Sequence, residues 1–180
     1  FYIDRTPPTA PSVTAVPDAW TNQDTVSITW SGLNDLTDLK KTEYRIDGGS
    51  WTDTGRTDKA YSGFTINISS LADGEHSIFV RGTDLAGNTG NAGTVKVYKD
   101  TAPPTAETSV DPDSWSNSDI LHILWQNAQD THSGLKQIEY AINENEYITV
   151  WPEESGGTDS AGLFPSPFGL LGLPDIEPIP

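Results

Sequence analysis

Hydrophobic and polar residues alternate along several short runs of the chain. Val26, Ile28 and Trp30 are separated by single polar residues, and so are Ile66 and Ile68. A period of two is typical of strands that turn one face to a core and the other to solvent. The first half of the chain therefore predicts antiparallel sheets, each with one buried face.

Turn-forming pairs such as Asp47-Gly48 and Asp73-Gly74 separate these runs. Gly and Pro also interrupt almost every window in which a helical period could start. The strands are predicted near residues 11–16, 24–30, 40–47, 50–54, 62–69, 75–83 and 92–99. Such short strands within about 95 residues favour a two-sheet Greek-key sandwich. An up-and-down barrel explains the alternation but not why so short a unit recurs.

The chain contains an internal repeat with a constant offset of 95 to 96 positions. The matching pairs are residues 2–10 with 98–106, 17–24 with 112–119, the run ending in Trp30 with the run ending in Trp125, and 39–47 with 135–143. Four blocks in the same order indicate two copies of one unit.

The repeat divides the chain into three parts. Residues 1–100 are predicted to form a complete repeat, 101–151 a partial second repeat, and 152–180 a tail rich in Pro, Gly and apolar residues. The tail either docks on its own unfinished sheet, packs on a partner subunit, or marks an unnatural end; docking on a neighbour is favoured. Pro7-Pro8 and Pro103-Pro104 are expected to hold the two joints extended.

The residues near the end of the first repeat resemble a known family. Residues 71–90, Leu-Ala-Asp-Gly-Glu-His-Ser-Ile-Phe-Val-Arg-Gly-Thr-Asp-Leu-Ala-Gly-Asn-Thr-Gly, resemble the closing segment of bacterial immunoglobulin-like repeats, and the hairpin of residues 44–51 fits the same pattern. The shape is similar to fibronectin type III domains. The resemblance covers residues 1–150 and implies an immunoglobulin-like sandwich, as found in adhesins, cell-surface stalks and accessory regions of secreted hydrolases.

Composition narrows the range of partners and chemistry. The chain carries 26 acidic and 10 basic residues, a net charge of −16, and no Cys. Such a surface repels nucleic acid and anionic lipid, and the lack of Cys excludes disulfides and thiolate metal sites. No apolar run reaches the roughly 20 residues that span a bilayer, so no membrane insertion is expected. The absence of Met suggests a piece of a longer protein.

Catalytic motifs are weak. Asp53-Thr54-Gly55 matches the aspartic-protease tripeptide, but that chemistry needs two such loops. His76, His122 and His132 are scattered and lack partners at metal-ligand spacing. We predict no enzymatic activity and assign no catalytic residue.

Calcium is the stronger chemical hypothesis. In the predicted topology, the N-terminal joint lies beside the loops after the second and sixth strands, which gathers four acidic residues: Asp4, Asp35, Asp38 and Asp84. The second joint would similarly bring together Asp18, Asp73, Asp100 and Asp130. Carboxylate oxygens at a joint suit Ca²⁺ and would stiffen it. The alternative is that these residues only begin turns, and the sequence does not assign a metal ligand.

Tryptophan offers a second hypothesis. Trp30 and Trp125 recur at equivalent positions and are expected in cores, whereas Trp51 is the best candidate for an exposed ring that binds sugar. Taken together, the sequence predicts a non-catalytic spacer or adhesion module of an extracellular or cell-surface protein. The alternative is a carbohydrate-binding accessory module of a secreted hydrolase. Its expected partners are neighbouring domains, another subunit or a glycan.

Overall fold

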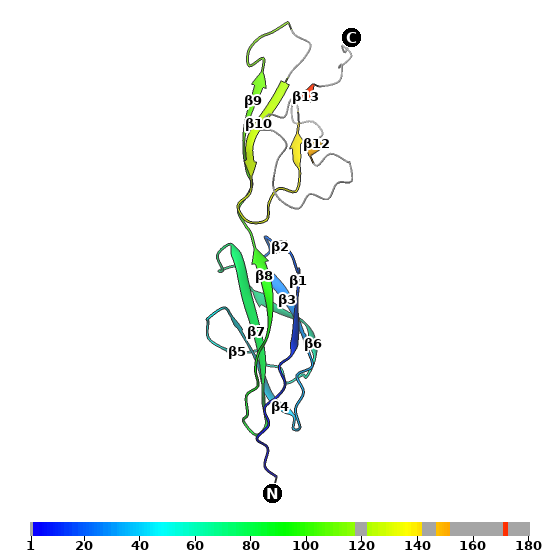
Figure 1. Ribbon diagram of the computed structural model, residues 1–180, viewed down its shortest axis with the longest axis vertical. Coiled ribbons are helices and arrows are strands. Elements are labelled where there is room, and N and C mark those ends of the chain that lie inside the picture. The colour runs from blue at the N-terminus through cyan, green and yellow to red at the C-terminus, as the bar shows by residue number, and fades with distance from the viewer. Residues whose placement is uncertain (1, 118–121, 142–146, 152–170, 173–180) are drawn as a thin grey trace. The chain divides into compact units, whose positions relative to one another are not determined.

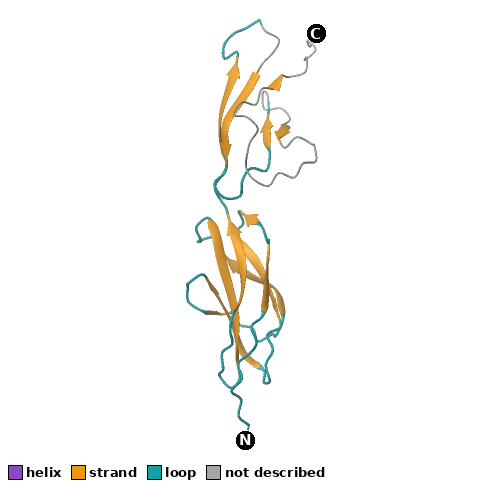
Figure 2. Cartoon of the chain, viewed as in Figure 1, coloured by secondary structure: helices purple, strands orange, loops and turns teal. Residues whose placement is uncertain are grey.

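The computed structural model describes residues 2–117, 122–141, 147–151 and 171–172, the last six without their side chains. The chain forms two compact units, residues 1–101 and 102–180. Within the described residues the units contain strands and loops and no helix, as Figure 2 shows. The all-β prediction is confirmed. No helix among those residues is long and apolar enough to cross a membrane.

The first unit contains a three-stranded antiparallel sheet. Its order is β1 (Ser12–Val16), β3 (Thr25–Ser31) and β6 (Tyr61–Asn67). β3 carries the alternating apolar residues to the inner face, where Val26, Ile28 and Trp30 are buried. The central strand of this sheet is thus the one with the most regular pattern in the sequence.

A second, five-stranded sheet completes the first unit. Its order is β2 (Trp20–Thr21), β8 (Gly93–Lys99), β7 (Gly74–Asp84), β4 (Leu39–Ile46) and β5 (Thr52–Asp53). β2 pairs with β8 in parallel, and the other pairs are antiparallel. β7 and β8 run side by side along the unit in Figure 1.

The core draws its side chains from both sheets. Its buried residues are Ala15, Val26, Ile28, Trp30, Leu33, Leu39, Ile66, Ile68, Ile78, Val80 and Val97. Trp30 contacts the rings of Tyr61 and Phe64, and its indole Nε1 donates a hydrogen bond to the carbonyl of Asp58 over 3.1 Å. Two open sheets that share one apolar core are consistent with a β-sandwich.

All of the strands predicted for residues 1–99 form, with ends displaced by a few residues. β2 was not predicted, because two residues cannot display an alternation. Trp20 in β2 packs on Tyr98 of β8 with ring centroids 5.4 Å apart. This aromatic contact therefore attaches the short strand to the edge of the five-stranded sheet.

The second unit begins like the first. β9 (Thr105–Asp111) pairs with β10 (His122–Gln129), and Trp125 stands opposite Thr108 as Trp30 stands opposite Val13. β11 (Ile138–Tyr140) pairs with β12 (Ile148–Trp151). In the tail, β13 (Leu171–Gly172) pairs with β10. The rest of the predicted 152–180 tail lies outside the described residues.

Candidate functional sites

Three carboxylates meet at one end of the first unit. Asp4, Asp35 and Asp84 each offer an oxygen, and these oxygens all lie within 4.8 Å of one another. Two ligands that each stand 2.3–2.6 Å from a calcium ion are at most about 5.2 Å apart. The spacing of the three carboxylates therefore fits a single bound cation.

Local hydrogen bonds set the position of each carboxylate. The two oxygens of Asp84, at the end of β7, accept bonds of 2.8 Å from the backbone amide and the side-chain amide of Asn88. Asp35 accepts 2.8 Å bonds from the amide and hydroxyl of Thr37. Asp4 accepts a bond from the amide of Thr6, and its carbonyl accepts one from Asn88. Asn88 thus joins the N-terminal segment to the loop after β7.

Two of these oxygens lack a hydrogen-bond partner although they are shielded from solvent: Oδ2 of Asp4 and Oδ1 of Asp35. Asp84 is fully buried. Burial alone would raise the pKa of Asp84, but the hydrogen bonds from Asn88 and the following amides lower it overall. Asp84 therefore stays ionised, and it lies beside two buried carboxylate oxygens that have no hydrogen-bond partner.

Three of the four residues predicted for this site come together, and Asp38 does not. Its carboxylate lies 3.7 Å from the ammonium of Lys59, and its backbone carbonyl accepts the amide of Leu85. That last bond fastens the loop before β4 to the loop after β7. Asp38 therefore contributes its backbone to the architecture of the site rather than its charge.

The acidic residues predicted at the second joint differ in their contacts. Asp73 accepts hydrogen bonds of 3.0 Å from the amide and hydroxyl of Thr101. Asp130, in the second unit, accepts bonds from the amides of His132, Ser133 and Gly134. With these bonds Asp130 has the turn-forming role that was the alternative to metal binding. Asp18 is exposed and Asp100 is buried.

Trp51, the predicted sugar platform, is covered by cations. The guanidinium carbon of Arg81 lies 3.8 Å from the Trp51 ring centroid, and that of Arg45 lies 4.8 Å from it. Arg45 also lies 4.7 Å from the ring centroid of Phe79. The ring is partly buried. Arg45 and Arg81 were not expected from the sequence, because the pairing of β4 with β7 decides which residues surround the ring.

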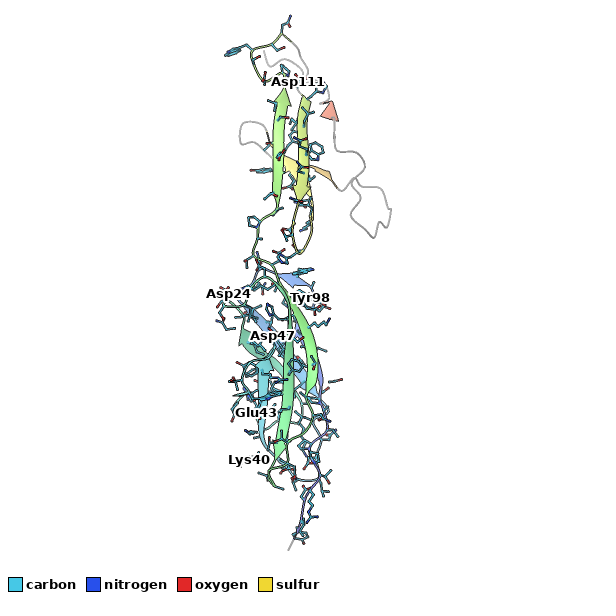
Figure 3. All side chains as sticks on the ribbon, turned by 60° about the vertical axis from the view of Figure 1, so that its left-hand side comes forward. Asp24, Lys40, Glu43, Asp47, Tyr98 and Asp111 are labelled. Atoms are coloured by element: carbon cyan, nitrogen blue, oxygen red, sulfur yellow. The ribbon has the colours of Figure 1, made fainter. Side chains whose placement is uncertain are left out.

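Glu43 connects this cluster to two further charges. It accepts a 2.6 Å hydrogen bond from Lys41, and its other oxygen pairs with Arg81 at 3.1 Å. Burial tends to raise the pKa of Glu43, but the bonds from Lys41 and Arg81 lower it overall. Figure 3 labels Glu43, which lies in β4, and Asp47, which lies in the turn after β4.

His76 and Asp53 have structural partners. The ring nitrogens of His76 lie 2.8 Å from Oδ2 of Asp47 and 2.9 Å from the carbonyl of Ala72. Asp53 accepts the amide of Gly55, which closes a local turn. In the Asp53-Thr54-Gly55 tripeptide, the Thr54 hydroxyl donates to the carbonyl of Thr42.

Comparison with known protein families gives no match, and no curated protein is significantly similar in sequence.

Proposed function

We propose that the chain is a non-catalytic spacer or adhesion module of an extracellular or cell-surface protein, built from immunoglobulin-like repeats. The strand order β1-β3-β6 against β2-β8-β7-β4-β5 supports a Greek-key sandwich of this kind. The internal repeat and the Pro-Pro pairs at its joints support a chain of units that positions other domains.

The observation that supports this proposal most directly is the cluster formed by the three carboxylates of Asp4, Asp35 and Asp84. It links the N-terminal segment to the loops after β3 and β7, which are far apart in the sequence. In this proposal a Ca²⁺ ion binds the three carboxylates and takes up the two oxygens that have no hydrogen-bond partner. The ion would fasten the segment that enters the unit to the sandwich, and so stiffen the joint.

Thermal unfolding of the whole chain in excess calcium and in chelator tests the proposal. Calcium at about one hundred times its dissociation constant adds about 2.7 kcal/mol to a folded state that alone binds it. For a unit of this size that corresponds to a rise of about 10–20 °C in the unfolding midpoint. Magnesium should give a smaller rise, because it demands a stricter octahedral geometry.

The matched variants are Asp35→Asn and Asp18→Asn, which remove the same charge. Asp35→Asn should abolish most of the calcium-dependent rise, whereas Asp18 lies exposed outside the group and its variant should behave like the parent. An identical midpoint with calcium and with chelator for the parent chain would exclude the metal and leave these carboxylates as turn formers.

A further inference from the structure

The outward face of the five-stranded sheet carries a cationic cluster in a strongly acidic chain. We define the guanidinium–aromatic cluster as Arg45, Arg81, Trp51 and Phe79, with Lys41 and Glu43 at its margin. Cross-strand pairing produces it: Arg45 stands opposite Phe79, and Glu43 stands opposite Arg81. Directly opposed residues on antiparallel strands share one face, so the cluster belongs to that face.

Arg45 is the cation of this cluster without a counter-ion. No carboxylate of the described residues is within ion-pair distance of it, although the chain has 26 acidic residues. Its Nε is buried and has no hydrogen-bond partner. Trp51 and Phe79 hold the guanidinium at 4.8 and 4.7 Å from their ring centroids. The two rings therefore hold the side chain in place, and its terminal amines, which make no hydrogen bond to a described residue, are left for an anion.

Arg81 and Lys41 add positive charge beside it. Both bind the one carboxylate of Glu43, whose side chain is only 10% exposed. Asp53, opposite Glu43 on β5, is exposed and brings a negative charge to the margin. Asp47, two residues beyond Arg45, is a third carboxylate near the cluster, but it is bound to His76 and to the amide of Ser77. Lys41 and Arg81 share Glu43, which leaves Arg45 without a carboxylate of its own among the described residues. At physiological ionic strength the Debye length of about 8 Å screens the net negative charge of the rest of the chain.

We propose that this face binds an acidic polysaccharide, with the carboxylate or sulfate groups of the polymer paired to Arg45 and assisted by Arg81 and Lys41. A neutral sugar is disfavoured because guanidinium groups already stack on the Trp51 ring. An added peptide strand is disfavoured because β4 and β7 each have hydrogen-bonded neighbours on both sides. A charged sugar polymer needs neither a free ring face nor a free strand edge. This inference does not depend on calcium binding.

The test is a calorimetric titration of the whole chain with three oligosaccharides: oligogalacturonate, a heparin oligosaccharide and neutral maltohexaose. Each titration is performed in chelator, so that the result is independent of calcium binding by Asp4, Asp35 and Asp84. We expect saturable binding of at least one acidic sugar, weakened by added salt, and none of maltohexaose. Binding of oligogalacturonate would identify carboxylate as a sufficient anion, and binding of heparin alone would identify sulfate.

The variants are Arg45→Gln and, as the matched control, Arg56→Gln. Arg56 also lies over an aromatic ring, 4.1 Å from the Tyr61 centroid, but outside the cluster. Arg45→Gln should weaken binding by about tenfold or more while the fold is retained, because a charge-assisted contact is lost. Arg56→Gln should bind as the parent does.

Several results would overturn the proposal. These are no binding of either acidic sugar, equal binding of maltohexaose, or undiminished binding by a folded Arg45→Gln variant. Tighter binding of oligoglutamate or of oligothymidylate at the same charge would also overturn it, in favour of an acidic protein or a nucleic acid.

Discussion

The two units contain the same first hairpin in different surroundings. In the first unit β1 pairs with β3, and in the second β9 pairs with β10, with equivalent residues opposite one another. Trp30 is 1% exposed, whereas its equivalent Trp125 is only partly buried. Ala15 is 5% exposed, and its equivalent Val110 is 45% exposed.

The five-stranded sheet accounts for this difference. In the first unit Ile78, Val80 and Val97 belong to the same buried cluster as Trp30. Among the described residues of the second unit, no strands equivalent to β7 and β8 are present. The paired strands therefore form in both units, and in the first unit the five-stranded sheet removes their apolar face from water.

Tryptophan truncation gives the sharpest contrast. Trp30→Ala should cost the first unit about 3–5 kcal/mol, since it removes a fully buried ring and its hydrogen bond to Asp58. Trp125→Ala should cost the second unit much less. Amide hydrogen exchange read separately for each unit measures both losses. Equal losses would contradict the difference in burial.

The next largest loss of stability is expected from a substitution at Lys99. Its ammonium is buried and donates to the carbonyls of Ile68, Ser69 and Leu71, whereas the equivalent position in the N-terminal segment is the exposed Ile3. Lys99→Met should destabilise the first unit by about 2–4 kcal/mol, because buried carbonyls lose their donor.

Chemical denaturation measures this loss, with Lys96→Met as the control. Lys96 is largely exposed and pairs with Glu75, so its variant should change stability little. If Lys99→Met were no more destabilising than Lys96→Met, the ammonium would not be holding the turn before β7.

The smallest expected effect concerns pH. Burial lowers the pKa of His76, but its bonds to Asp47 and Ala72 outweigh this and raise it above the ordinary value of 6.5. The hydrogen bond from the Ser77 amide and, second to it, the hydrogen bond with His76 lower the pKa of Asp47 below 3.8. A raised histidine pKa stabilises the fold below about pH 6.5, and this contribution is lost as the pH rises through the folded-state pKa.

The Asp47 contribution has the opposite sign, being present above about pH 3.8 and lost as the pH falls through its lowered pKa. The pair should therefore stabilise the first unit most between these limits. The change above pH 6.5 should stay below about 1 kcal/mol, as for a solvent-screened pair. Urea unfolding at a series of pH values measures it. His76→Gln should flatten the profile in that range, and a profile unchanged by this variant would exclude the pair as its source.

The expected topology was sufficient to predict that three carboxylates lie close together; whether they bind a metal stays a prediction. Asp4, Asp35 and Asp84 meet because the N-terminal segment and the loops after β3 and β7 lie at one end of the unit. Asp38 is only three residues from Asp35, yet it turns to Lys59. The path of a loop backbone decides such a difference, and residue spacing does not record it.

Local patterns in the sequence predicted most strands of the first unit and part of its core, including Val26, Ile28 and Trp30, because a period of two and the turn chemistry are local properties of the chain. The folded arrangement of the strands was needed to show that cations cover Trp51 and that Arg45 has no counter-ion among the described residues. Both follow from the register of β4 against β7, residues more than thirty positions apart. Register depends on the packing of two whole sheets, and a shift of one residue would send each of these side chains to the other face.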